Sequence, residues 1–244
     1  MISALLRMAV GLCLFVLPPV GAQAQPASAP KTVGLISAMT DLMTVTTLAR
    51  NAISDQERRF PIESWKISDR VAKAAAAQLG KGFKVQRIPV PAGAFLSLGN
   101  PGFFAPSFDN NYARLVQAIA GSQKADFYLA ITPGYSRIGN ADRIARGLGV
   151  IKSETLLTQK DVVYCLVLYR VFDAQFQMVR SEGALLGKAS RTETIAGPSL
   201  SLEGKERLPP EAYVVANDNR TRELLVDLLD KDLAATLPKL FARK

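Results

Sequence analysis

Residues 126–132, DFYLAIT, and residues 161–172, DVVYCLVLYRVF, are the stretches that decide the fold. Both are nearly continuous apolar runs, as expected of strands that are covered on both faces. Segments with helical periodicity lie before, between and after them, which indicates helices layered on a sheet. We therefore expect an α/β (α+β) protein in which helices pack on a single mixed β-sheet of about six strands.

Three segments have the apolar spacing of helices. The first begins at Ile67 and ends at Gly80, and the second contains Tyr112 to Ile119 behind candidate N-caps at 109–111. The third runs from about 220 to 241, with a stripe of leucines at steps of four and a natural cap at 217–219. These helices should cover the sheet.

The remaining apolar runs predict how the strands connect. Residues 32–38 and 43–49 should form an opening hairpin, and residues 175–186 should return beside 161–172 as a second hairpin. Helical crossovers would make the strands at 43–49, 83–90 and 126–132 parallel to one another, while the two hairpins would add antiparallel partners to the sheet.

Long connections in this arrangement would meet at one edge of the sheet. The segments are 50–64, 91–111, 133–160 and 187–210, and they would all emerge on the side where the parallel strands have their carboxyl ends. Long loops in compact domains are often functional, and open α/β sheets bind ligands at this edge. The sequence therefore predicts a binding site there.

Two loops supply the candidate binding residues of this edge, which are Phe103, Phe104, Phe108, Tyr135, Arg137, Arg143 and Arg146. The phenylalanines either pack inward on the sheet, which we favour, or present an apolar patch to a partner. The basic loop at 133–160, whose glycines expose the backbone, either binds a phosphate or carboxylate or is a solvated loop without a ligand.

The first 24 residues have the features of a signal peptide. Arg7 precedes an apolar run at 8–17, and Ala22-Gln23-Ala24 is a small-x-small cleavage motif. The run is interrupted at Pro18 and Pro19, whereas a spanning helix needs about 20 apolar residues. We expect a periplasmic or secreted protein without a transmembrane helix after cleavage, in which residues 25–31 are a disordered leader and residues 32–244 form a single α/β domain.

Composition narrows the function classes. The chain has no histidine, which removes histidine-activated nucleophiles and the commonest ligand of catalytic zinc, so we predict no metal and no cofactor. Cys165 is the only cysteine after residue 24 and should be buried.

The mature chain has a formal charge of +8. This charge either favours an anionic envelope component as partner, or it reflects basic residues that are scattered over a solvated surface without a dedicated partner. Another envelope protein is the second candidate partner, and nucleic acid is not expected.

Residues 65–90, 115–132 and 163–180 together resemble two kinds of envelope domain. Their helix–strand units, "ADFYLAIT" and the "LYRVFDAQFQMVRSE" hairpin are similar to domains of the curli-secretion lipoprotein type and to the amino-terminal domain of TolB. The resemblance implies an α/β domain of the bacterial envelope. The chain lacks the lipidated cysteine of the first and the propeller of the second, so neither pore formation nor membership of the Tol system is implied.

These observations lead to two functional hypotheses at the same edge. The first is a non-enzymatic interaction or envelope-accessory protein, and the second is a histidine-free hydrolase or binding protein for an anionic small molecule. A flat apolar and basic surface would favour the first. A concave pocket with converging carboxylates, lysines or tyrosines would favour the second.

Export is directly testable on the full chain produced in a bacterial host. We expect the mature protein in the periplasm or medium, with Gln25 as its first residue by intact mass and amino-terminal sequencing. Recovery from the cytosol with residues 1–24 still attached would contradict this prediction.

Overall fold

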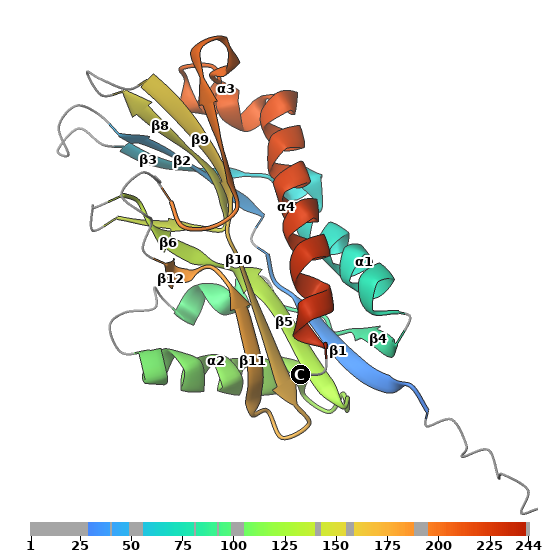
Figure 1. The fold of residues 1–244 in the computed structure, drawn as a ribbon. Helices are drawn as coiled ribbons and strands as arrows, with labels where there is room; N and C mark the ends of the chain where they lie inside the picture. The colour runs from blue at the N-terminus through green and yellow to red at the C-terminus, as the bar shows by residue number, and fades with distance from the viewer. Residues whose placement is uncertain are drawn as a thin grey trace, which may run out of the picture.

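The computed structural model of the chain describes residues 29–39, 41–48, 56–80, 82–91, 93–98, 105–139, 143–154, 159–187 and 195–242. It has the expected α+β class, with helices packed on mixed sheets (Figure 1). The expected single sheet of about six strands is wrong, because the strands form two five-stranded sheets and a smaller three-stranded one.

The elements follow one another in this order: β1 (Lys31–Ser37), β2 (Leu42–Leu48), β3 (Gln56–Pro61), η2 (Glu63–Trp65), α1 (Ile67–Leu79), β4 (Phe83–Arg87), η3 (Ala94–Leu98), α2 (Ala105–Ala120), β5 (Phe127–Pro133), β6 (Tyr135–Arg137), β7 (Ile144–Arg146), β8 (Leu148–Glu154), β9 (Gln159–Cys165), β10 (Val167–Asp173), β11 (Met178–Gly183), β12 (Leu185–Gly187), β13 (Ser199–Glu203), η4 (Gly204–Glu206), α3 (Ala212–Asn217) and α4 (Asn219–Leu240).

The first large sheet has the strand order β11-β10-β5-β1-β4. Strand β1 pairs in parallel with β4 and β5, whereas β10 runs antiparallel to both β5 and β11. The hairpin predicted after residue 172 is therefore confirmed. Strands β4 and β5 share one direction as expected, since both are parallel to β1, and β10 is the expected antiparallel partner. The expectation that residues 43–49 join them as a third parallel strand is wrong, because β2 belongs to the second large sheet.

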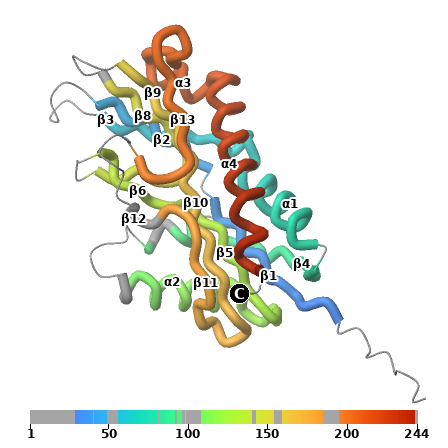
Figure 2. Tube along the Cα trace, in the orientation of Figure 1, coloured from blue at the N-terminus to red at the C-terminus, as the bar shows by residue number. Residues whose placement is uncertain are grey.

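The second large sheet has the strand order β13-β9-β8-β2-β3, as the tube in Figure 2 shows, and β12, β6 and β7 form the small sheet. Strand β2 pairs with β3 and β8, while β1 belongs to the first sheet. The predicted opening hairpin of 32–38 and 43–49 is therefore wrong. Strand β1 pairs with β4 and β5, and β2 pairs with the following β3 and with the distant β8. Pairing between distant segments leaves no mark in local periodicity.

One apolar run supplies a strand to each large sheet. Residues 161–172 divide at Leu166 into the end of β9 and most of β10. The Leu166 amide donates to the Gly147 carbonyl at 2.8 Å, and its carbonyl accepts from the Gly134 amide at 2.8 Å. The expected single strand is thus two strands, because the backbone hydrogen bonds of Leu166 go to the segments that connect the sheets.

Both faces of the first sheet are covered, which explains the continuous apolar runs. Leu129 and Ile131 face α1 and α4, whereas Tyr128 and Ala130 face α2 on the opposite side (Figure 1). Gly34 on β1 permits close packing on the second face, since a Cβ there would lie 2.8 Å from Ile88 Cδ1. The alternation of neighbouring residues between two hydrophobic layers is the expected pattern of a central strand.

The helix predictions are confirmed in two cases and corrected in one. Helix α1 ends at the expected glycine, and α4 begins where Asp218 accepts a hydrogen bond from the Thr221 amide at 2.9 Å. The predicted leucine stripe of α4 is buried. Helix α2 begins at Ala105, so Asp109 lies inside the helix and is not its cap. Among the described residues, no helix has both the length and the apolar composition that crossing a bilayer requires.

A buried ion pair joins the second sheet to the segment before α3. Lys152 Nζ lies 3.3 Å from Asp161 Oδ2, and the two side chains are 1% and 0% exposed. Lys152 also donates to the Leu208 and Pro209 carbonyls, while Asp161 accepts from the Leu208 amide at 2.7 Å. Each buried charge is therefore compensated by hydrogen bonds as well as by its partner.

Replacing Asp161 with asparagine should destabilise the protein by about 3–5 kcal/mol, because it leaves the Lys152 ammonium buried without a counter-ion. Urea unfolding of the full chain measures the change. The matched control is Asp227→Asn, whose ion pair with Lys231 is more than half exposed on both sides and should contribute about 0–1 kcal/mol. Equal losses of stability in the two variants would contradict the conclusion that the buried Lys152–Asp161 pair contributes more than an exposed ion pair.

Candidate functional site

A pocket of about 560 Å³ lies at the carboxyl ends of β1 and β4. Ser37 closes β1, Arg87 closes β4, and Ser68 comes from the first turn of α1. Phe95 of η3 and Arg146 of β7 close the side towards the small sheet. The ends of two parallel strands leave this space because their connections diverge, as in other open α/β sheets.

A cluster of stacked arginines and aromatic rings continues from this pocket towards α2. We call it the arginine–aromatic cluster, and its members are Phe108, Tyr112, Tyr135, Arg146 and Arg170. Arg146 Cζ lies 5.1 Å from the centroid of the Tyr135 ring, and Arg170 Cζ lies 4.3 Å from that of Tyr112 and 5.1 Å from that of Phe108. Phe95 links cluster and pocket, with its ring centroid 5.1 Å from that of Tyr112.

The strands place both arginines by simple register. Tyr135 and Arg146 are a cross-strand pair of β6 and β7, so their side chains lie on the same side of the small sheet. Arg170 lies opposite the small Ala130 on β5 and faces α2, between Leu168 and Phe172. This position puts a guanidinium inside a hydrophobic layer, where it is 1% exposed.

The two guanidinium groups have more donors than the described protein groups accept. Arg170 Nη2 contacts Asp109 Oδ1 at 2.6 Å, whereas its Nε and Nη1 are buried and have no acceptor within the described part of the chain. Arg146 Nη2 donates to the Phe95 carbonyl at 3.3 Å, and its buried Nε likewise has none there. Buried donors without acceptors are unfavourable, so these positions favour an added acceptor.

The tyrosines of the cluster remain neutral. Burial raises the pKa of Tyr135, and the nearby Arg146 and Arg170 charges only partly offset this effect. Burial also raises the pKa of Tyr112, whose hydroxyl shares a 2.9 Å hydrogen bond with Thr132 Oγ1. Since the tyrosines carry no charge, the charged groups in contact within the described part of the cluster are two cations, Arg146 and Arg170, and one carboxylate, that of Asp109.

Two acidic residues also line the pocket. They are Asp41 and Glu63, and the pKa of Asp41 is raised by partial burial and by the charges of Glu63 and Asp69. Arg87, which also lines the pocket, is paired with Asp69 at 2.6 Å. The lining thus includes both basic and acidic side chains, which suits a ligand with an anionic group and separate hydrogen-bond donors.

The two serines of the pocket have structural hydrogen bonds. Ser37 Oγ donates to the Ser68 carbonyl at 3.1 Å, and Ser68 Oγ donates to the Met39 carbonyl at 3.0 Å. These bonds fasten the end of β1 to the start of α1. A nucleophilic serine instead needs a base that accepts its proton, so this arrangement favours binding over covalent catalysis.

Of the residues predicted from sequence, the structure brings Phe108, Tyr135 and Arg146 into one cluster. Phe108 is 6% exposed and packs inward, as favoured for the phenylalanines of that loop. Phe103 and Phe104 lie outside the described residues. Arg137 and Arg143 are half-buried at β6 and just before β7, and neither is among the residues that line the pocket.

The expected long loop at 133–160 is wrong over its described parts, which form β6, β7 and β8. Strands of three residues are too short for an alternating pattern to be recognised, and this explains the error for β6 and β7. Lone Cys165 is fully buried as predicted, and burial raises the pKa of its thiol.

Sequence reasoning missed Arg170, Tyr112 and Asp109 as site residues. A signal for Arg170 was available, because it is the only charged residue in the apolar run 162–172. A charge within a two-sided buried strand needs a partner, and its position is therefore informative. Nothing local indicates that Tyr112 and Asp109 of α2 would be those partners.

Comparison of the chain with protein-family models and with curated proteins finds no match in either. The function is therefore inferred from the geometry of the pocket and the cluster.

We expect the buried Arg170 side chain, which belongs to the candidate site, to lower the free energy of unfolding of the protein. Replacing it with methionine, which has similar length and no charge, should leave the free energy of unfolding unchanged or raise it by about 1–4 kcal/mol. Asp109 is 35% exposed and can be solvated after the change. Urea unfolding at neutral pH is the measurement, and a loss of several kcal/mol would mean that Arg170 is a structural residue.

Proposed function

We propose that this protein is an exported, non-enzymatic binding protein that holds an anionic group of an envelope component at Arg146 and the arginine–aromatic cluster. The observation that carries the proposal is the set of three buried guanidinium nitrogens, on Arg146 and Arg170, without acceptors among the described residues. A phosphate or carboxylate would supply such acceptors, and guanidinium groups bind both in bidentate fashion.

The pocket walls suggest what else the ligand carries. Ile88, Pro89 and Val90 add apolar lining, and Asp41 with Glu63 adds acceptors. We infer a ligand with a phosphate or carboxylate near Arg146, an apolar part, and hydroxyl or amine donors that reach Asp41 or Glu63. The volume of about 560 Å³ is in the range of small-molecule sites, so the ligand would be a small molecule or the terminal part of a larger component.

The alternative is a histidine-free hydrolase that acts on an anionic small molecule in the same pocket. It has less support, because Ser37 and Ser68 donate to main-chain carbonyls instead of to a base. Location in the periplasm or outside the cell rests on the features of residues 1–24, and the resemblance to envelope domains agrees with it. The net positive charge would attract anionic partners from a distance.

The binding proposal is tested with Arg146→Gln and Arg170→Met in the mature chain. Titration calorimetry with inorganic phosphate, glycerol phosphate and acetate at low ionic strength should show that each variant binds about tenfold to a hundredfold more weakly than the native protein, because each loses a charged hydrogen bond of about 1.5–3 kcal/mol.

The matched control is Arg220→Gln, which removes an exposed arginine from α4. It should retain the native affinity, since it changes the net charge by the same amount at a distance from the pocket. Unchanged affinity in both site variants, or an equal loss in the control, would refute the proposal. Binding that is intact but accompanied by turnover of phosphate esters would support the hydrolase.

A further inference from the structure

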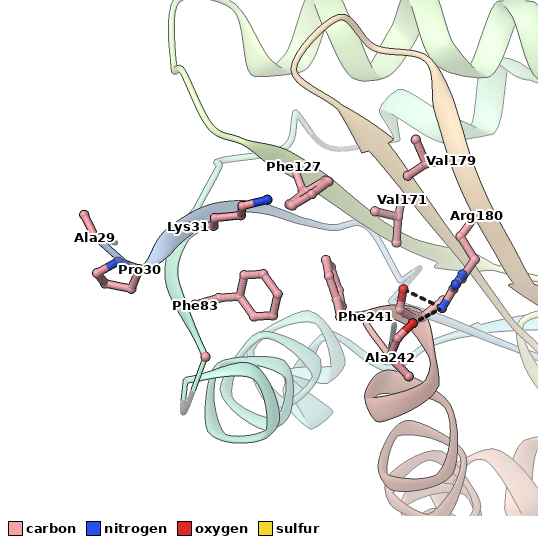
Figure 3. A pocket seen from close by; sticks show the side chains of 12 residues that line it. Ala29, Pro30, Lys31, Phe83, Phe127, Val171, Val179, Arg180, Phe241 and Ala242 are labelled. Carbon is pink, nitrogen blue, oxygen red and sulfur yellow. Dashed lines mark hydrogen bonds between the residues drawn. The ribbon is translucent and has the colours of Figure 1, made fainter. Parts of the chain in front are cut away.

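A second pocket, of about 490 Å³, lies at the opposite end of the first sheet, where β1, β4 and β5 begin (Figure 3). We call it the phenylalanine pocket, because Phe83, Phe127 and Phe241 form its centre. The ring of Phe241 lies 4.8 Å from that of Phe83 and 6.0 Å from that of Phe127, measured between centroids. These half-buried rings come from β4, β5 and the end of α4, so only the folded chain brings them together.

Two basic side chains accompany the rings. Lys31 Nζ lies 5.4 Å from the centroid of Phe127, and Arg180 extends from β11 towards the end of α4 (Figure 3). None of the residues that line the pocket is acidic. Neither cation forms an ion pair within the described part of the chain. Asp126, beside Phe127, accepts a hydrogen bond from the Thr32 amide at 2.6 Å and is not among the lining residues.

Arg180 uses only part of its donor capacity. Its Nη1 donates to the carbonyls of Lys239, Leu240 and Ala242, the latter two at 3.0 and 3.3 Å. This contact places a positive charge on the carboxyl end of α4, where the helix dipole is negative. Within the described part of the chain these contacts use Nη1, so Nη2 and Nε of the same guanidinium can donate to a ligand while Nη1 holds the helix end.

An exposed apolar side chain lies at the rim of the pocket on the β11 side. Val179 lines the pocket and is 53% exposed. A large apolar side chain beside a concave aromatic surface adds to the apolar area that a ligand can cover. The pocket thus combines a floor of aromatic rings, an apolar side chain at its rim and two cations, and none of its lining residues is acidic. This combination is complementary to an anion with an apolar body.

We propose that the phenylalanine pocket binds a small amphiphilic carboxylate, with its apolar chain against Phe83, Phe127 and Phe241 and its carboxylate between Lys31 and Arg180. This site is separate from the pocket at Arg146 and does not depend on the function proposed there. A bilayer surface would need a broad exposed basic face, whereas here the two charges flank a concave space of small-molecule size.

The test uses dodecanoate as the probe, below its critical micelle concentration, with dodecanol as the uncharged analogue of the same chain length. Calorimetry on the mature protein should give saturable binding of one dodecanoate and at least about tenfold weaker binding of dodecanol. Lys31→Glu with Val179→Glu should weaken dodecanoate binding by about tenfold or more, since both changes put a negative charge beside the carboxylate.

Both substituted residues are on the surface, so the fold should survive, and thermal unfolding without ligand verifies this. The matched control is Lys205→Glu with Val214→Glu, which makes the same chemical changes at exposed positions of η4 and α3 and should retain native affinity. Arg146→Gln should also bind dodecanoate normally, which separates this site from the first.

The proposal would be overturned by absence of saturable dodecanoate binding, by equal affinity for dodecanol, or by insensitivity to the Lys31→Glu and Val179→Glu changes. Binding to vesicles of phosphatidylglycerol that is lost in the site variant, together with no binding of monomeric dodecanoate, would likewise overturn it and identify a membrane surface as the occupant.

Discussion

The strand pair β5 and β10 lies at the centre of the first sheet, and its burial on both faces is the constraint on which the rest of the structure depends. Two-sided burial requires a helical layer on each side, which α1 with α4 and α2 provide. It also requires that every side chain of these strands be compatible with a hydrophobic layer. The constraint extends to the second sheet, because β9 of that sheet leads directly into β10 through Leu166.

Arg170 is the exception to that constraint, and its surroundings show how the exception is accommodated. Its charge is compensated by Asp109 and by the faces of the Phe108 and Tyr112 rings, while two of its nitrogens lack protein acceptors in the described structure. The buried pair of Lys152 and Asp161 differs in kind, since main-chain groups of residues 208 and 209 add further hydrogen bonds to it. Hydrogen bonds therefore compensate both charges of the Lys152–Asp161 pair, whereas Arg170 keeps two unused donors, and Arg207 beside Asp161 keeps one, its Nε, among the described residues.

The two pockets use the opposite ends of the first sheet in different ways. At the carboxyl ends of β1 and β4, diverging connections leave a polar space with a basic and an acidic wall. At the amino ends, the strands begin beside the carboxyl end of α4, and aromatic side chains partly fill the gap. Helix α4 therefore contributes both to the core, through its leucine stripe, and to the edge of a pocket, through Phe241.

Local sequence determined the α+β class, the positions of α1 and α4, the buried strand β5 and the closing hairpin, because helical periodicity, capping residues and apolar runs act over a few residues. It also pointed to Phe108, Tyr135 and Arg146. Only the tertiary structure decided that β1 and β2 belong to different sheets, that residues 161–172 supply a strand to each large sheet, and that Arg170 and Asp109 join the candidate site. Strand pairing and side-chain contacts between distant segments depend on which surfaces are buried together, and that information is not contained in any single stretch of the chain.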